Sequence, residues 1–256
     1  MAKRLLLILI VVIPFFGFTQ DFTLQWQGHF SYLDIKDVSQ GNNKLFAAAE
    51  NAVFVYDTET LETSTISTVH GLSGEVISQI HYSEVYELLI VGYENGLMEI
   101  VFDNDDDVLT IVDILEKPTI APDAKIINHF NEYNGLVYIS TDYGISVYDL
   151  ERLEFGDTYF MGNGGSQIIV KQTTIFNDFI YAACRNGNGL KRASIFSNDL
   201  VDFNEWETVL NGNNTAIENF DNKLFLVRFS RFIAVENNGV FMNLFRYEEN
   251  PLDTRA

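Results

Sequence analysis

Cysteine is nearly absent from this chain of 256 residues, since Cys184 is the only one, so no intrachain disulfide can form. The sequence also lacks Gly-x-Ser-x-Gly, His-Glu-x-x-His and Cys-x-x-Cys motifs, the signatures of serine hydrolases, zinc proteases and thiol redox enzymes. Nothing in the sequence pairs Cys184 with a histidine, and it falls in a strand-like apolar segment. We therefore predict a small buried strand residue, with a catalytic thiol as the alternative.

Basic residues are scarce as well. The chain has 16 Lys and Arg against 36 Asp and Glu, a formal net charge of −20. Such a surface repels nucleic acid and anionic lipid at long range, and no Lys/Arg cluster with interleaved aromatic residues offsets it. It favours cationic partners, divalent ions, or simply solubility. We expect no nucleic-acid partner.

Long apolar runs are missing, with one exception at the N-terminus. Lys3 and Arg4 precede an apolar stretch over residues 5–16, and polar or small residues follow. This order predicts a signal peptide over residues 1–20 and export to the periplasm or the cell surface. The stretch is short for a membrane span, and an uncleaved anchor is the alternative. We expect no membrane span in the mature part, residues 21–256.

What the chain does contain is a unit repeated about every 45 residues. An apolar segment of strand type recurs five times, and the steps between the copies are 44, 48, 43 and 44 residues. This period, built from short strands, is typical of β-propeller blades. The third positions of the five copies are Phe46, Ile90, Tyr138, Tyr181 and Phe225.

Other features keep the same register. Val-Tyr-Asp occurs at 55–57 and again at 147–149, and Leu-Glu follows at 61–62 and at 153–154. We therefore predict an all-β fold, a propeller of about five four-stranded antiparallel blades. A sandwich or barrel without a true repeat is the alternative. The predicted blades cover residues 34–69, 74–115, 125–160, 167–208 and 214–256.

The clearest blade shows how the pattern specifies local structure. Its predicted strands cover residues 76–82, 88–93, 97–102 and 108–115. Asn95-Gly96 and Tyr143-Gly144 predict hairpin turns with a positive φ at glycine, because a side chain disfavours that conformation. Pro118 cannot donate to a strand ladder, so residues 116–118 predict the crossing to the next blade.

The chain is short for a closed ring. Six blades of this size need about 270 residues, more than the mature chain supplies. We therefore expect an incomplete or open propeller, a piece of a larger protein, whose first and last blades do not pair.

Two clusters are candidates for chemistry. Residues 103–107, Asp-Asn-Asp-Asp-Asp, suggest calcium, but the EF-hand glycine and glutamate are missing, so a solvated hairpin tip is the better interpretation. His81 and His129 each lie 15 residues before a turn glycine, Gly96 and Gly144. Equivalent places on successive inner strands would favour a metal or acid–base site; packing is the alternative.

Two further patterns have a simpler interpretation. Residues 162–166, Gly-Asn-Gly-Gly-Ser, have the composition of a phosphate loop, but no Lys-Ser/Thr follows, so we predict a flexible inter-blade loop. Asn213-Asn214-Thr215 matches a glycosylation sequon, a pattern common by chance. The sequence therefore assigns no catalytic, cofactor-binding or metal-binding residue, and we expect a protein that is not an enzyme and uses no cofactor.

The strongest blade carries a family resemblance. Residues 70–74 (His-Gly-Leu-Ser-Gly), 89–92 (Leu-Ile-Val-Gly) and 95–97 (Asn-Gly-Leu) resemble the repeat of two-component-regulator propellers, although Ile90 and Tyr93 replace the usual Trp and Thr. With Trp26, Tyr32, 45–49 (Leu-Phe-Ala-Ala-Ala), 54–57 (Phe-Val-Tyr-Asp) and 82–83 (Tyr-Ser), residues 22–256 look closer to the N-terminal propeller of PorZ-like proteins of the type IX secretion system in Bacteroidetes.

The resemblance implies a binding or scaffold module, not an enzyme. Such proteins are longer, with two propellers and a C-terminal domain, and act at the cell surface with the sortase that processes secreted cargo. The resemblance thus implies sortase-like protein partners, and a role in attaching cargo to anionic lipopolysaccharide or another glycan. The alternative is the periplasmic ligand-sensing propeller of a two-component system.

Overall fold

A computed structural model of the chain describes residues 33–104 and 107–246. Within these residues the chain forms twenty strands and three short 3-10 helices, η2 (Thr68–His70), η3 (Pro122–Ala124) and η4 (Phe203–Glu205). The predicted signal peptide, Trp26 and Tyr32 lie outside the described residues. Among the residues described, no helix has the length and apolar character needed to cross a membrane.

The strands form five antiparallel sheets of four, each made of strands consecutive in sequence. Blade 1 contains β1 (Asp37–Gly41), β2 (Lys44–Ala48), β3 (Val53–Asp57) and β4 (Thr63–Ile66). Blade 2 contains β5 (Ile77–Ser83), β6 (Leu88–Tyr93), β7 (Met98–Phe102) and β8 (Val108–Ile111). Blade 3 contains β9 (Ile127–Tyr133), β10 (Leu136–Thr141), β11 (Ile145–Asp149) and β12 (Glu154–Tyr159).

Blade 4 contains β13 (Val170–Phe176), β14 (Phe179–Cys184), β15 (Leu190–Ser194) and β16 (Glu207–Leu210). Blade 5 contains β17 (Asn214–Phe220), β18 (Lys223–Arg228), β19 (Phe232–Asn237) and β20 (Val240–Arg246). The described part of the chain is thus an all-β, open propeller of five blades, as predicted. Two bounds differ. β16 extends two residues beyond the predicted end of blade 4 at 208, and the strand predicted over 108–115 ends at Ile111, because the residues that follow form a hydrogen-bonded turn.

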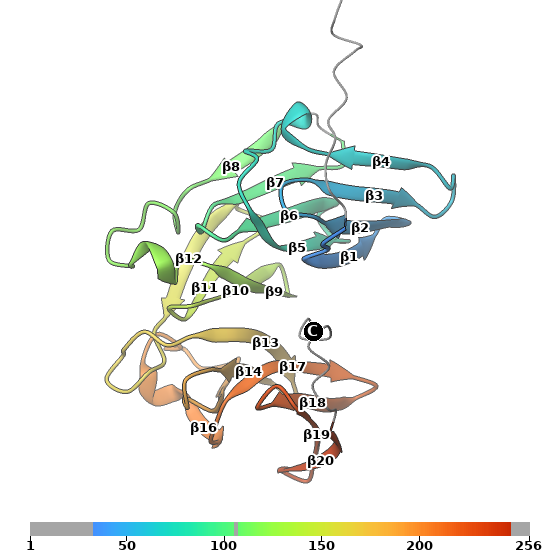
Figure 1. Ribbon diagram of the computed structural model, residues 1–256. Coiled ribbons are helices and arrows are strands. Elements are labelled where there is room, and N and C mark those ends of the chain that lie inside the picture. The colour runs from blue at the N-terminus through green and yellow to red at the C-terminus, as the bar shows by residue number, and fades with distance from the viewer. Residues whose placement is uncertain (1–32, 105–106, 247–256) are drawn as a thin grey trace, which may run out of the picture.

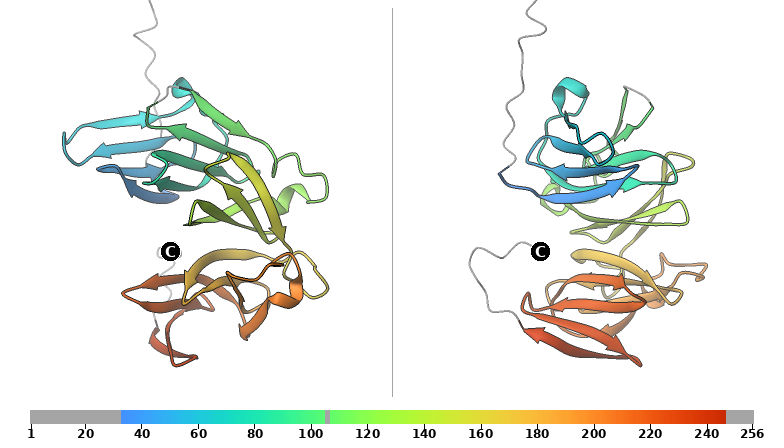
Figure 2. Two further views of the ribbon diagram at one scale, coloured as in Figure 1. Left: turned by 180° about the vertical axis from the view of Figure 1, so that it is seen from behind. Right: turned by 90° about the vertical axis from the view of Figure 1, so that its right-hand side faces the viewer.

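The blades fan out in an open arc (Figure 1). Their first strands, β1, β5, β9, β13 and β17, are neighbours along the inner side of the arc, and the fourth strands lie on its outer side. The two further views show blades 1 and 5 at the two ends of the arc (Figure 2). Among residues 33–104 and 107–246 these two blades share no strand ladder, as expected for an open arrangement.

The five repeat positions are structurally equivalent. Each is the third residue of the second strand of its blade. Four of the five side chains are buried, but Phe225 of blade 5 is only half-buried. The core explains this difference, because it consists of clusters that lie between neighbouring blades.

Alternate residues of each second strand face opposite neighbours. Ile90 packs toward blade 3, whereas Leu89 and Val91 pack toward blade 1. The same alternation places Tyr138 between blades 3 and 4, and Tyr181 between blades 4 and 5. Phe225 faces the side of blade 5 that no described blade covers, and so it keeps part of its surface exposed.

Both predicted turn glycines have a positive φ, 87° at Gly96 and 148° at Gly144. A second set of turns was not predicted. Four of the five first hairpins close through two residues that both have positive φ, the geometry of a type I′ turn, which favours Asn, Asp and Gly. These pairs are Asn42-Asn43, Asn134-Gly135, Asn177-Asp178 and Asp221-Asn222.

Blade 2 is the exception, and its longer first hairpin changes the position of His81 relative to His129. Its first hairpin has four loop residues, 84–87, in place of two, so its inner strand is displaced by two residues relative to the others. His81 is paired with Ile90, whereas His129 is paired with Ser140, two residues beyond Tyr138. The two histidines therefore occupy different rows, and the prediction that they are equivalent is wrong.

Candidate functional site

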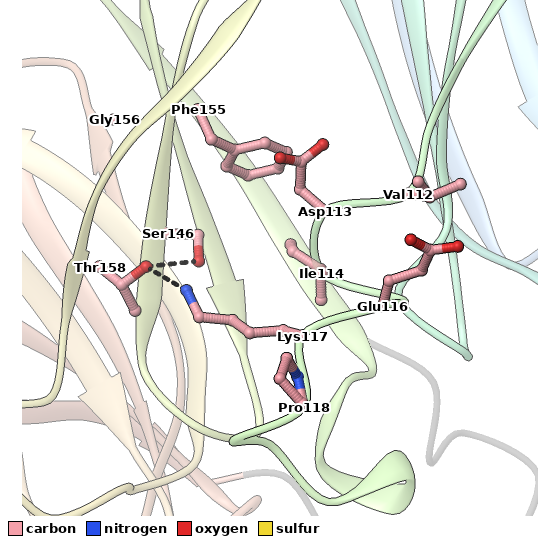
Figure 3. A pocket seen from close by; sticks show the side chains of 10 residues that line it. All are labelled: Val112, Asp113, Ile114, Glu116, Lys117, Pro118, Ser146, Phe155, Gly156 and Thr158. Carbon is pink, nitrogen blue, oxygen red and sulfur yellow. Dashed lines mark hydrogen bonds between the residues drawn. The ribbon is translucent and has the colours of Figure 1, made fainter.

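A cleft of about 410 Å³ lies between blades 2 and 3, near the outer side of the arc (Figure 3). One wall is the crossing segment after β8, and the other is formed by β11 and β12 of blade 3. Its lining is half polar or charged and half apolar: Val112, Asp113, Ile114, Glu116, Lys117, Pro118, Ser146, Phe155, Gly156 and Thr158.

The crossing segment is held as a tight turn. The amide of Glu116 donates to the carbonyl of Val112 at 2.7 Å, and the amide of Lys117 donates to that of Ile114 at 3.2 Å. The buried Ile114 side chain anchors the turn in the core between blades 2 and 3. Lys117 follows on the same turn, and its side chain extends toward Thr158 of β12 (Figure 3).

Lys117 reaches across the cleft to blade 3. Its Nζ donates to Oγ1 of Thr158 at 2.9 Å, and Thr158 Oγ1 lies 3.4 Å from Oγ of Ser146 (Figure 3). Ser146 is in turn 2.7 Å from the hydroxyl of the buried Tyr143. A chain of hydroxyls therefore links the ammonium group to the interior of blade 3.

The pKa values of Lys117, which lines the cleft, and of the nearby Tyr148 are shifted from their ordinary values. Burial lowers the pKa of Lys117, and the charge of Asp113 partly offsets this effect. Burial also raises the pKa of Tyr148 to about 12, with the charge of Asp113 as the next cause. Lys117 thus has a reduced preference for its charged form.

This chemistry suits binding. The cleft offers an ammonium donor, two hydroxyls, the carboxylates of Asp113 and Glu116, and the ring of Phe155. Neither histidine nor cysteine lines it, so the described lining contains no pair of nucleophile and imidazole base. A polar ligand with both donors and acceptors, or a polar protein loop, matches this set of groups.

His81 makes a contact between blades, and His129 is buried without a partner for its Nδ1 among the described residues. His81 Nε2 lies 2.9 Å from Oε2 of Glu132, which also accepts a hydrogen bond from Ser83 through Oε1 at 3.0 Å. These contacts connect the inner strands of blades 2 and 3. The ring of His129 is largely enclosed, its Nδ1 has no partner among the described residues, and burial lowers its pKa to about 4. No group of three His, Cys, Asp or Glu that could hold a metal occurs within residues 33–104 and 107–246.

The predicted solvated tip is exposed at Asn104 and Asp107, between β7 and β8, and Asp103 is the exception. Its side chain is only 13% exposed and accepts hydrogen bonds from Tyr82 at 2.7 Å and from Asn42 at 2.6 Å. Lys44 lies 3.7 Å away. Asp103 therefore connects blades 1 and 2, while residues 105–106 lie outside the described part of the chain.

Cys184 is confirmed as a small buried residue of strand β14. It packs in the cluster between blades 3 and 4, where burial raises its pKa to about 12. Such a thiol carries almost no thiolate near neutral pH, so it is a poor nucleophile.

The two glycine- and asparagine-rich patterns both lie between blades. The segment 162–166 connects blades 3 and 4 and is closed by the amide of Gly162, which donates to the carbonyl of Ser166 at 3.0 Å. Asn213 precedes β17, and its Oδ1 accepts a hydrogen bond from the amide of Gly187 in blade 4 at 2.8 Å.

Sequence reasoning recognised residues 116–118 as a crossing but missed their place in a cleft. The only available signal was the group of charged residues before Pro118, and nothing in it specified Thr158 as a partner. Two further cavities were also missed. One of about 600 Å³, mostly apolar, lies on the outward face of blade 1, and one of about 440 Å³ lies at the junction of blades 4 and 5.

Comparison with known proteins gives a family match. A model of the N-terminal β-propeller domain of PorZ, a type IX secretion protein, matches residues 45–207, more than half of the chain. The matched segment runs from β2 to the start of β16 and so includes most of blades 1 to 4. No curated protein matches the chain by sequence.

Solved structures share the fold. PorZ of Porphyromonas gingivalis, described as an essential bacterial surface component of the type IX secretion system, superposes with a TM-score of 0.69 at 17% identity, over 86% of this chain and 29% of that one. The extracellular domain of a hybrid two-component system from B. thetaiotaomicron gives 0.60 at 14% identity, over 84% and 27%. The designed protein Ika8 gives 0.55 at 13%, over 86% and 63%. The chain thus spans less than a third of the length of the two natural proteins.

Proposed function

The chain belongs to the family of PorZ N-terminal β-propeller domains, and we propose that it is a non-enzymatic, exported binding module of type IX secretion. The single observation that carries the proposal is the family match across blades 1 to 4. The lining of the cleft between blades 2 and 3 supports binding over catalysis, because it combines Lys117, hydroxyls and carboxylates without an imidazole or thiol.

The proposed role is to help attach secreted cargo to anionic lipopolysaccharide, at the cell surface or in the periplasm, together with a sortase-like protein. The charge of the chain favours a protein partner for the propeller itself. A net charge of −20 repels an anionic glycan at long range and attracts a cationic protein surface. We therefore propose that the propeller contacts the attachment machinery, and that the machinery contacts the lipopolysaccharide.

The test is the location of cargo in the source bacterium. In a strain with an in-frame deletion of the gene, secreted cargo should appear in the medium instead of on the cell surface. Immunoblotting of cell and medium fractions measures this distribution. Complementation with the full-length gene should restore attachment. Normal attachment in the deletion strain would refute the proposed role.

The sensor alternative predicts a different result. Extracellular domains of two-component systems share the fold, and a sensor would change transcription without moving cargo. Transcript profiles of the same deletion strain therefore separate the two functions. A changed regulon with cargo still attached would favour the sensor.

The cleft can be tested separately. The double variant Asp113→Asn, Lys117→Met in the full-length protein should reduce surface attachment if the cleft receives the partner. Arg152→Gln, an exposed change on blade 3, is the matched control and should leave attachment unchanged. Equal attachment in both variants at equal protein levels would remove the cleft from the proposal.

A further inference from the structure

The outward face of blade 1 carries a mostly apolar groove of about 600 Å³. Blade 1 lies at one end of the arc, and no described blade packs against this face, because its buried cluster lies on the side of blade 2 (Figure 2). The groove has room for more than one aromatic side chain. Its floor consists of two rows of paired residues on β1, β2 and β3, Val38-Ala47-Phe54 and Gln40-Leu45-Tyr56.

The repeat indicates that this face is built to be covered. Leu45 and Ala47 of blade 1 stand in the same rows as Leu89 and Val91 of blade 2. Leu89 and Val91 are fully buried because they pack against blade 1. Leu45, in contrast, is 45% exposed, and Val38 is 68% exposed. A contiguous apolar patch of this kind normally marks a surface that binds another segment or molecule.

The sequence just before blade 1 has the pattern of a strand that could cover this face. Residues 22–32 lie outside the described residues, but their sequence alternates strictly. Even positions are apolar except Gly28, and odd positions are polar. The apolar residues are Phe22, Leu24, Trp26, Phe30 and Tyr32, and the polar residues are Thr23, Gln25, Gln27, His29 and Ser31. Such alternation is typical of an extended segment with one buried and one solvated face.

Position and charge favour this segment over other occupants of the groove. It ends directly before Leu33, four residues ahead of β1, so it is tethered beside the groove at a high effective concentration. Extended, its eleven residues span about 36–40 Å, more than enough to cross three strands. It contains no Asp, Glu, Lys or Arg, whereas a second copy of the chain, with a net charge of −20, would be repelled.

We propose that residues 22–32 fold back over the outward face of blade 1 and place their apolar side chains in the groove, with Trp26 near the centre. The polar residues of the segment then face solvent. The segment covers blade 1 as blade 1 covers Leu89 and Val91 of blade 2. This inference does not depend on the role in secretion, because it rests on the groove and on the adjacent sequence.

The experiment uses the mature chain, residues 21–256, with Trp206→Phe, so that Trp26 is the only tryptophan. We expect Trp26 to show the fluorescence of a buried indole and to be protected from quenching by acrylamide. Val38→Lys places a charge in the groove, so it should shift the emission to longer wavelength and increase quenching at least threefold. A thermal melt verifies that each variant is folded.

A second measurement does not require the Trp206 substitution. Deletion of residues 22–32 from the mature chain should uncover the groove and increase binding of the apolar dye anilinonaphthalene sulfonate severalfold. Adding Val38→Lys to the deletion should remove most of this increase, because the charge makes the groove unfavourable for the dye. Equal dye binding with and without the segment would contradict the proposal.

The matched control is Val85→Lys in the first hairpin of blade 2. Val85 is 78% exposed and does not line the groove, so the emission of Trp26 should not change. A solvent-exposed Trp26 in the folded chain would overturn the proposal and leave the groove to a partner protein. Burial of Trp26 that depends on protein concentration would also overturn it, because a second copy would then be the occupant. Neither result bears on the location of cargo, which tests the role in secretion.

Discussion

The junction between blades 2 and 3 and the junction between blades 4 and 5 are built from the same repeat positions, yet they differ in what fills them. At the first, Ile127 completes an apolar cluster and Glu94 follows the second strand. At the second, these positions are Asn214 and Arg185. The backbone of the two junctions is equivalent. Packing of the core therefore does not explain why polar residues replace apolar ones at the second junction.

A reciprocal exchange between the junctions should give the largest effect. Ile127→Asn places an amide in a fully apolar cluster and should lower the free energy of unfolding by about 3–5 kcal/mol. Asn214→Val should raise it by about 1–2 kcal/mol, because it removes a buried amide that has no partner. Urea denaturation measures both values. Destabilisation by Asn214→Val would show that the amide has a structural role.

The lowered pKa of His129 should contribute to the pH dependence of the free energy of unfolding. Its pKa is lowered from 6.5 in the unfolded chain to about 4 by burial, so the folded state binds fewer protons between these values. The resulting stability is fully present above pH 6.5 and is lost as the pH falls through 4, about 3 kcal/mol in all.

His129→Gln is the matched control for this effect, because Gln79 and Gln172 occupy the same row in blades 2 and 4. Denaturation at pH 7.5 and at pH 4 should show a smaller loss of stability in the variant than in the wild type. The same loss in both proteins would place the titration in other groups.

Substitution of the equivalent turn glycines Gly96 and Gly187 allows a direct comparison of packing at the two junctions. A Cβ on Gly96 would meet Ile114 at 2.7 Å and the carbonyl oxygen of Lys125 at 3.0 Å, whereas a Cβ on Gly187 would meet nothing within 4 Å. Both residues have φ above 80°, so alanine strains the backbone by about 1 kcal/mol at either site.

Gly96→Ala should therefore cost about 2–3 kcal/mol in total, because steric overlap adds to the strain, and Gly187→Ala only about 1 kcal/mol. Chemical denaturation of the two variants tests this difference. Equal costs would mean that the two junctions are packed alike near these turns.

The smallest expected effect concerns a turn that blades 1 and 3 share. Leu61 and Leu153 both have a positive φ, near 62° and 53°, and each follows an aspartate that caps the turn, Asp57 or Asp149. Leu61 is 67% exposed and Leu153 39%. Leu61→Asn should raise the free energy of unfolding by about 0.5–1 kcal/mol, because asparagine tolerates this conformation better. A thermal melt with a lower midpoint than that of the wild type would contradict this.

Much of the fold could be predicted from periodicity. The repeat positions, the turn glycines and the buried Cys184 follow from local sequence pattern, because each blade repeats the same order of strands and hairpin turns at nearly the same spacing. The histidine row could not be placed, because the longer loop at 84–87 shifts the inner strand of blade 2, so that an equal spacing to the turn glycine does not mark an equivalent position. Asp103 was misjudged because its partners Tyr82 and Asn42 come from other hairpins.

By itself, the sequence determined the class of fold, the five blades, the third-position residues and the resemblance to PorZ-like propellers, since all of these are local patterns repeated along the chain. Tertiary structure decided which neighbouring blade each side chain packs against. It closed the cleft between Lys117 and Thr158, 41 residues apart, and brought Arg185 to the same cavity as Asn213 and Thr215. These contacts form across the junctions between blades, where the partners belong to different repeats and no spacing in the sequence specifies their distance.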